Sequence, residues 1–315
     1  MSASAPDARA ERRVGLRLVV LAIFAGLLLP LDSLEAQRHS DWAHQRRIDV
    51  DAPWGRTPAL VTFPRRGDRR GYPPGQRYPL LVALHGRGEA LEGPDRGYLG
   101  WAIRYDLPDA FGALMRGRLS NADYRGFVRE GHLEEANRSL RGRPFEGVMV
   151  VTPYLPDLSG QPADGDRVRE AVAWLSGPLL EAVRERWEGA ARGREATGID
   201  GVSLGGRIAL EAGLSRPDVF GAVGATQPAV GGRERALADR AAAVQNPQRI
   251  RLLTSDDDPF LWATRRLSQS LRERQVSHSL TVVPGPHDYA FNRGPAGIEM
   301  LLFHDRALAR EPFEP

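Results

Sequence analysis

The 315-residue sequence contains no cysteine, and because all 43 of its basic residues are arginine it contains no lysine either. The lack of cysteine excludes disulfides, thiolate nucleophiles and cysteine-ligated metals. The lack of lysine excludes the G-x-x-x-x-G-K-[ST] loop that binds nucleotide phosphates. An H-E-x-x-H zinc motif does not occur. The sequence therefore predicts neither a cofactor nor a bound metal.

Charge of one sign is not concentrated anywhere in the chain. The 43 basic residues are interspersed with 40 acidic ones, and the net charge is only +3. A nucleic-acid-binding protein would instead gather its basic residues on one face or one helix, so nucleic acid is not an expected partner. With 42% hydrophobic residues, the chain is large enough for one large α/β domain, which we place at residues 40–315.

The most prominent apolar run lies near the N-terminus, over residues 18–29. Three arginines, at positions 12, 13 and 17, precede it, and Pro30 closes it. The run is short for a membrane span, which needs about 20 residues, but it suits the core of a signal peptide. Residues 1–36 are therefore predicted to be a signal peptide that exports the protein to the periplasm or beyond. If it is not cleaved, residues 18–31 would anchor the chain in a membrane.

The rest of the sequence alternates between short apolar segments and amphipathic segments. Such alternation predicts a doubly wound, mostly parallel sheet, here opened by an antiparallel hairpin with its turn at residues 53–55. The expected strands cover residues 47–50, 59–63, 80–84, 147–151, 196–200, 219–226, 250–254 and 278–283. The expected helices cover residues 108–119, 168–187 with a kink at 177–178, 207–214, 233–244, 261–274 and 297–309.

About 60 residues separate the strand at 80–84 from the next strand, far more than one crossover helix requires. We predict that part of residues 102–146 forms an insertion or lid over the carboxyl edge of the sheet. A single crossover helix followed by a long polar loop is the alternative.

The hexapeptide at residues 201–206, GVSLGG, stands between an extended segment and a helix-forming segment. In that context a G-x-S-x-G pattern predicts a nucleophile elbow, a turn so tight that glycines must flank the serine. Ser203 is the expected nucleophile, and Gly201, Gly205 and Gly206 are expected to allow the turn. An ordinary glycine-rich strand–helix turn is the alternative.

A serine hydroxyl needs a base to remove its proton, and the base needs an orienting carboxylate. His287 follows the strand at 278–283, which is where this fold class places its base. Three aspartates follow the preceding strand and compete for the acid; we favour Asp258, with Asp256 and Asp257 as alternatives. They could also cap the following helix or bind a cation.

The oxygen of a tetrahedral intermediate needs peptide N–H donors. The first expected donor is Leu204, the residue after the nucleophile. The second should come from the loop after the strand at 80–84, where we choose Arg87. His85 and Gly86 belong to the same loop, and His85 is expected to shape it rather than to act in catalysis.

The other histidines fit the role of base less well than His287 does. His39 and His44 precede the sheet, His132 lies in a polar tract at residues 121–143, His278 begins a strand, and His304 falls in the last helix, where we expect a surface position.

The segments around Ser203, His287 and the loop at His85 resemble those of the α/β-hydrolase superfamily, and more narrowly the esterase group that includes esterase D and feruloyl-esterase-like enzymes. The matching segments are residues 84–86, 201–206 and 285–288. In that group an aromatic residue and a helix follow the acid, as Phe260 and residues 261–274 follow Asp258. The resemblance covers residues 79–288 without accounting for 102–146, and it implies a Ser–His–Asp hydrolase of esters, thioesters or occasionally peptides.

The sequence thus predicts a cofactor-independent serine esterase that acts on a small-molecule or polymer-attached ester. A serine peptidase or amidase using the same three residues is one alternative. A non-catalytic exported binding protein that keeps the hydrolase scaffold is another, because a fold alone does not establish a function.

Overall fold

The structure, a computed structural model, describes residues 43–64 and 76–312. These residues belong to one compact unit. The predicted signal peptide or anchor, residues 1–36, lies outside the described residues. Among the helices that are described, none combines the length and the apolar character needed to cross a membrane.

The centre of the fold is an eight-stranded sheet with the strand order β1-β2-β5-β4-β6-β7-β8-β9. The pairs β1–β2 and β2–β5 are antiparallel. The remaining pairs of this sheet are parallel, so the sheet is mostly parallel and opens with an antiparallel hairpin, as predicted. The strands are β1 (Ala43–Ala52), β2 (Gly55–Pro64), β4 (Leu80–Leu84), β5 (Met149–Pro153), β6 (Thr197–Gly201), β7 (Ala222–Thr226), β8 (Arg249–Asp257) and β9 (Ser279–Pro286).

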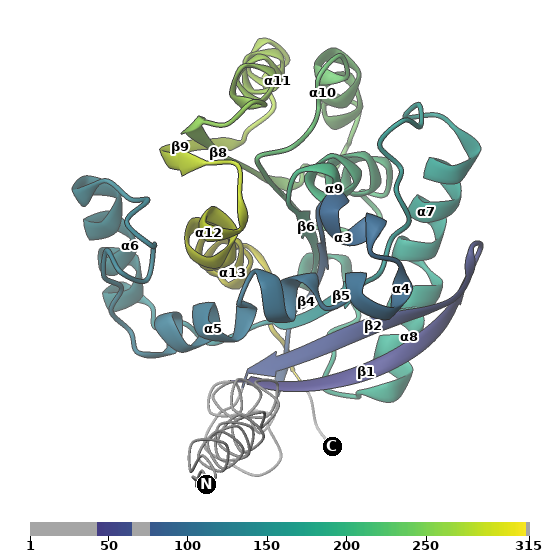
Figure 1. Cartoon of the computed structure of the whole chain (residues 1–315), viewed down its shortest axis with the longest axis horizontal. Coiled ribbons are helices and arrows are strands. Elements are labelled where there is room, and N and C mark those ends of the chain that lie inside the picture. Colours follow the sequence, from purple (N-terminus) through teal and green to yellow (C-terminus); the bar gives the residue numbers. More distant parts are fainter. Residues whose placement is uncertain (1–42, 65–75, 313–315) are drawn as a thin grey trace, which may run out of the picture. The chain divides into compact units, whose positions relative to one another are not determined.

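Helices cover both faces of this sheet. Alternate residues of β4 enter two different cores, Leu80, Val82 and Leu84 in one and Leu81 and Ala83 in the other. This explains the unbroken apolar run of the strand, since a strand buried on both faces has no polar side. In Figure 1, α7 and α9 lie to one side of β6, and α12 and α13 lie to the other.

The first core is closed by helices α7 to α11, and the second by α5, α6 and α13. The predicted kink at residues 177–178 is a break into two helices, since Gly177 ends one and Pro178 begins the next. The long helices are α5 (Leu107–Met115), α6 (Glu130–Gly142), α7 (Asp166–Ser176), α8 (Pro178–Arg186), α9 (Leu204–Ser215), α10 (Glu234–Ala242), α11 (Leu261–Glu273) and α13 (Gly297–Ala307).

No helix was predicted over residues 130–142, where α6 lies, because this segment is mostly polar. Several short elements also had no signal in the sequence. They are α3 (Arg87–Leu91), α4 (Pro94–Gly97), the π-helix η1 (Gly100–Arg104), the 3-10 helix η2 (Arg194–Ala196), α12 (Tyr289–Phe291), the π-helix η3 (Asn292–Ala296), and the strand pair β3 (Gln76–Arg77) and β10 (Glu311–Pro312). Most are one turn long, too short to show a hydrophobic period.

The long segment between β4 and β5 packs against the chain that follows His287. The Tyr124 hydroxyl donates to Glu299 in α13 at 2.6 Å, and His132 in α6 lies 2.8 Å from the same carboxylate. The rings of Phe127 and Phe291 are 6.2 Å apart. This segment therefore buttresses the C-terminal part of the fold.

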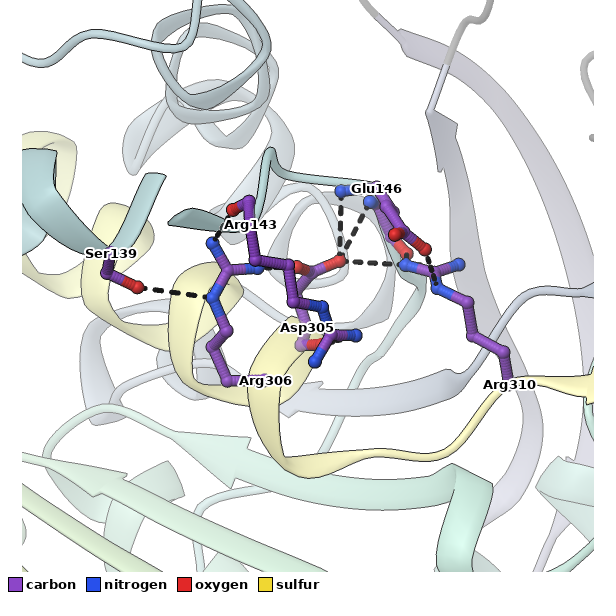
Figure 2. A network of polar contacts seen from close by, with 7 residues as sticks. Ser139, Arg143, Glu146, Asp305, Arg306 and Arg310 are labelled. Atoms are coloured by element: carbon purple, nitrogen blue, oxygen red, sulfur yellow. Dashed lines mark hydrogen bonds and ion pairs between the residues drawn. The ribbon is translucent and has the colours of Figure 1, made fainter. Parts of the chain in front are cut away.

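A buried aspartate fastens the end of α13 to the segment that leads into β5 (Figure 2). Asp305 accepts the peptide N–H groups of Glu146 and Gly147 at 3.1 and 3.0 Å and a guanidinium N–H of Arg310 at 2.8 Å. The neighbouring Arg306 donates to Ser139 in α6 at 3.2 Å. Burial raises the pKa of Asp305, and these donors offset part of that effect.

The expectation for His304 was wrong. Its side chain is fully buried between α13 and the sheet and bonds to Asp200 of β6 at 3.0 Å. The helix α13 lies against a sheet face, so a polar residue on its inner side needs a buried partner, and no helical period reveals that partner.

Candidate active site

Ser203 sits at a sharp turn between β6 and α9. Its backbone has φ 57° and ψ −116°, a strained conformation for a residue that is not glycine. A Cβ atom on Gly201 would lie 2.5 Å from the Gly205 carbonyl carbon, and one on Gly205 would lie 2.3 Å from the His85 oxygen. Strand, turn and helix therefore approach so closely that both positions require glycine.

The structure brings the predicted nucleophile, base and acid together from three separate loops. His287 Nε2 lies 3.0 Å from Ser203 Oγ, and His287 Nδ1 lies 2.9 Å from Asp258 Oδ1. Because a carboxylate only accepts, Nδ1 carries the proton and Nε2 has a free lone pair for the serine hydroxyl. The chain order and the contacts are those of a Ser–His–Asp triad.

Asp258 is held in place by further donors. Thr254 Oγ1 donates to its Oδ2 at 2.5 Å, and Phe260 N donates to its Oδ1 at 3.0 Å. The Phe260 ring also packs edge-on against His287, with 5.3 Å between centroids. A buried carboxylate bonded on both oxygens has a fixed orientation, as an orienting acid needs.

The alternative acids lie elsewhere. Asp256 accepts the Gly285 peptide N–H at 3.1 Å and pairs with Arg129 at 3.1 Å, both away from the base. Asp257 is exposed at the end of β8. The β8–β9 ladder has a register shift between Ser255 and Asp257, immediately before Asp258. In the described part of the chain, no group of three or more acidic or histidine side chains is arranged to hold a metal.

The two expected oxyanion donors each begin a helix. Arg87 is the first residue of α3 and Leu204 the first residue of α9, so neither peptide N–H has an acceptor within its own helix. The neighbouring Gly86 N–H donates to the Tyr105 hydroxyl at 3.0 Å and is already engaged. The Arg87 side chain turns away and pairs with Asp157 at 2.9 Å.

A cavity of about 370 Å³ opens beside Ser203 and His287. Its wall is formed by residues 85–89 after β4 (called the oxyanion loop below, after its expected role), by the turn at Ser203 and by the segment after β9. Its lining residues are Gly86, Arg87, Gly88, Glu89, Tyr105, Val202, Ser203, His287, Asp288, Tyr289 and Asn292. Of the predicted lid, residues 102–146, Tyr105 is the residue that lines this cavity. A larger hollow of about 880 Å³ between α5 and α6 contains no histidine and lies apart from the triad residues.

No protein-family model and no curated protein matches the sequence. Solved structures do match its fold. A ferulic acid esterase matches with a TM-score of 0.59 and 16% identity, covering 85% of this chain and 100% of its own. An S-formylglutathione hydrolase from Staphylococcus aureus matches at 0.54 and 14%, covering 84% and 98%. An enterobactin and salmochelin hydrolase matches at 0.52 and 16%, covering 86% and 98%. The chain has the α/β-hydrolase fold.

In this α/β-hydrolase fold, His85 supports the oxyanion loop from below. The Leu155 N–H donates to its Nε2 at 3.0 Å, so the proton is on Nδ1, which donates to the Gly86 carbonyl at 2.9 Å. Burial lowers the pKa of His85, which keeps the ring neutral and this pattern intact.

Two polar residues beside Ser203, Glu89 and Tyr105, were not predicted from the sequence. Both side chains are about 1% exposed, and the Tyr105 hydroxyl donates to the Glu89 carboxylate in a short hydrogen bond. A signal for Glu89 was present, since a carboxylate in the oxyanion loop is an unusual choice for a buried position. Tyr105 had none, because the π-helix η1 that brings it back to the loop has no sequence pattern.

Proposed function

We propose that this protein is a serine hydrolase that cleaves carboxylic esters through an acyl-enzyme intermediate. The observation that carries the proposal is the contact of Ser203 Oγ with His287 Nε2, with Asp258 on the opposite ring nitrogen, at a strained elbow beside a cavity. The names of the matching structures, an esterase and two hydrolases, support the same reaction class.

In the first half-reaction, Ser203 Oγ attacks the ester carbonyl carbon while its proton moves to His287 Nε2. The carbonyl oxygen becomes an oxyanion, which the peptide N–H groups of Leu204 and Arg87 stabilise. Asp258 holds the ring and balances the positive charge of the imidazolium. The imidazolium then protonates the departing alkoxide, which leaves as an alcohol.

In the second half-reaction, water replaces the alcohol. His287 Nε2 takes a proton from the water as the water oxygen attacks the acyl carbon, and a second oxyanion forms in the same place. The proton then returns to Ser203 Oγ as the bond to the acyl group breaks, which releases the carboxylic acid and regenerates the enzyme.

The test is hydrolysis of p-nitrophenyl acetate, butyrate and octanoate by the full chain, by Ser203→Ala and by His287→Ala. We expect both variants to lose about 10⁴–10⁶-fold in kcat with an unchanged melting temperature. A fluorophosphonate should label the wild type and leave Ser203→Ala unlabelled. Turnover of these esters by Ser203→Ala at the wild-type rate would contradict the proposal.

The same experiment separates the two alternatives. Cleavage of peptide anilides in preference to the p-nitrophenyl esters would indicate a peptidase or amidase. Absence of both turnover and labelling in the folded wild type would indicate a binding protein on a hydrolase scaffold.

We further propose that the enzyme is exported, on the strength of the arginines and the apolar run that precede residue 36. Expression of the full chain followed by fractionation should recover a shortened protein, its new N-terminus near Gln37, in the periplasm or the medium. Recovery of the uncut chain in the membrane fraction would instead support an anchor at residues 18–31.

A further inference from the structure

Glu89 is a carboxylate buried beside the nucleophile, and the mechanism proposed above does not use it. It lies in α3, two residues after Arg87, is about 1% exposed and lines the cavity that holds Ser203. Removing a carboxylate from water is costly unless donors satisfy it. The hydrogen-bond partners of a buried carboxylate therefore indicate its role.

Glu89 interacts with Tyr289 and with Tyr105, and Tyr105 reaches the oxyanion loop from the end of η1. Its hydroxyl makes two bonds, accepting the Gly86 peptide N–H at 3.0 Å and donating to Glu89 Oε2. The direction is fixed, because a peptide N–H can only donate and the hydroxyl proton is therefore free for the carboxylate. Burial and the charge of Glu89 raise the pKa of Tyr105 well above its usual value, which keeps the hydroxyl protonated.

The bond to Gly86 decides which peptide group of the loop remains available. Gly86 is the N-cap of α3, and Arg87 is the first residue of the helix. Once the Gly86 N–H is bonded to Tyr105, the N–H groups of Arg87, Gly88 and Glu89 remain without an acceptor in the helix, and that of Arg87 is the next one along the chain. Fixing one peptide group also fixes the orientation of the next.

Gly86 also lies close to the nucleophile. A Cβ atom on Gly86 would lie 3.2 Å from the Tyr105 hydroxyl, 3.4 Å from Glu89 Oε2 and 3.8 Å from Ser203 Cβ. The hydroxyl, the carboxylate and the nucleophile therefore surround one glycine. A shift of the loop would change the distance between its peptide N–H groups and an oxyanion formed at Ser203.

We propose that Tyr105 and Glu89 are positioning residues that hold the oxyanion loop, so that the Arg87 N–H and not the Gly86 N–H meets the oxyanion. The inference rests on the proposed hydrolase function. Neither side chain touches the substrate carbonyl in this arrangement; both act through the peptide group of Gly86. The chain of bonds from Gly86 through Tyr105 to Glu89 strengthens each member, because a hydroxyl that accepts a bond donates better.

The central variant is Tyr105→Phe, which removes the hydroxyl and keeps the ring that packs edge-on against Trp101. Complete loss of one oxyanion donor costs about 10²–10³-fold in kcat, and a misplaced donor should cost less, about 10- to 100-fold. We expect kcat and kcat/KM on p-nitrophenyl acetate to fall together, because the contact that is weakened, between the Arg87 N–H and the oxyanion, exists only in the transition state. Affinity for an alkyl trifluoromethyl ketone, which forms a tetrahedral adduct on serine, should weaken in parallel.

Tyr154→Phe is the matched control. The Tyr154 hydroxyl is also buried and also bonds to α3, donating to the Ala90 carbonyl at 3.1 Å, but it does not reach Gly86. Removing it should lower the melting temperature about as much as Tyr105→Phe does, with kcat within about threefold of the wild type. An equal loss of kcat in both variants would overturn the proposal, since general loosening of α3 would then explain the effect.

A second pair of variants keeps the proposal testable if Tyr105→Phe does not fold. Glu89→Ala removes the acceptor of the Tyr105 hydroxyl, whereas Glu89→Gln keeps an amide oxygen there without the charge. We expect Glu89→Ala to lose about tenfold in kcat and Glu89→Gln to recover most of that loss. Equal kcat in wild type and Glu89→Ala would overturn the positioning role.

The failure of this inference can be told apart from the failure of the proposed function. An active wild type, an inactive Ser203→Ala and an undiminished Tyr105→Phe would remove only the positioning role. A folded wild type that neither hydrolyses esters nor reacts with a fluorophosphonate would overturn both.

Discussion

Two histidine–aspartate pairs among the described residues have nearly equal distances but use opposite ring nitrogens, Nδ1 of His287 at the carboxyl edge of the sheet and Nε2 of His304 between the sheet and α13. His287 and Asp258 are 2.9 Å apart, and His304 and Asp200 are 3.0 Å apart. The first pair ends at Ser203. The second lies between β6 and α13 and contacts no nucleophile.

The pairs differ in what surrounds them. The His287 side chain is 25% exposed and its second nitrogen faces a hydroxyl, whereas His304 is fully buried. The second nitrogen of His304 lies against β6, since a Cβ atom on Gly198 would be only 2.5 Å from it. Access to the free ring nitrogen, and not the pairing with a carboxylate, separates a candidate base from a structural histidine.

The charges differ as well. Asp200 binds Arg251 at 2.9 Å in addition to His304, so its charge is already balanced when the histidine is neutral. Although burial raises the pKa of Asp200, Arg251 and His304 hold it below its usual value. Burial lowers the pKa of His304. The buried group is a neutral histidine on a compensated ion pair, and it stabilises the fold without moving a proton.

The largest expected effect comes from the same substitution in both pairs. Asp258→Asn should lower kcat about 10⁴-fold with little change in stability, because the amide cannot hold the required tautomer. Asp200→Asn should leave kcat per folded molecule within about threefold and lower the free energy of unfolding by about 3–5 kcal/mol, because Arg251 loses its counter-ion. Steady-state kinetics and urea unfolding of both variants measure this contrast. An Asp258→Asn variant with normal kcat and reduced stability would contradict it.

A smaller effect is expected from filling the space beside His304. Gly198→Ala should lower the free energy of unfolding by about 1–3 kcal/mol, because the new methyl group would overlap the ring and has no room to move. Gly131→Ala is the control, since Gly131 lies in α6 with open space around it and should keep or slightly raise stability. Equal melting temperatures for the two variants would show that His304 does not pack as described.

The smallest expected effect is a pH dependence of opposite sign for two histidines. Because the folded pKa of His304 is lowered, its contribution to stability is present above the unfolded value of 6.5 and is lost as the pH falls through the folded pKa. The hydrogen bond to Glu299 raises the pKa of His132, so its contribution is present below 6.5 and is lost as the pH rises through the folded pKa.

Urea unfolding of the wild type, His304→Gln and His132→Gln between pH 5 and 8 measures both slopes. On acidification below pH 6.5, His304→Gln should lose less stability than the wild type. On acidification from pH 8 to pH 6.5, the wild type should gain stability from protonation of His132, and His132→Gln should lack that gain. Parallel curves for all three proteins would mean that neither histidine changes its protonation differently on folding.

Much of the fold could be predicted because its signals are local. The apolar run of β4 and the glycine spacing around Ser203 describe a strand and a turn within a few residues of each other. The long helices other than α6 also appeared close to their expected limits, whereas α6 lies in a polar segment where no helix was predicted. The predicted end of β8 was too early, because the strand continues to Asp257 through hydrogen bonds with β9 that no local pattern contains.

The sequence by itself determined the class of sheet, the strained turn that carries Ser203, and the candidate base, since each depends on short-range periods, glycine spacing or chain order. Only the tertiary structure decided that Asp258 and not Asp256 meets His287, that His304 is buried, and that Tyr105 returns to the oxyanion loop. The physical reason is that these contacts join residues between 16 and 104 positions apart, and their distances are set by strand register and helix packing.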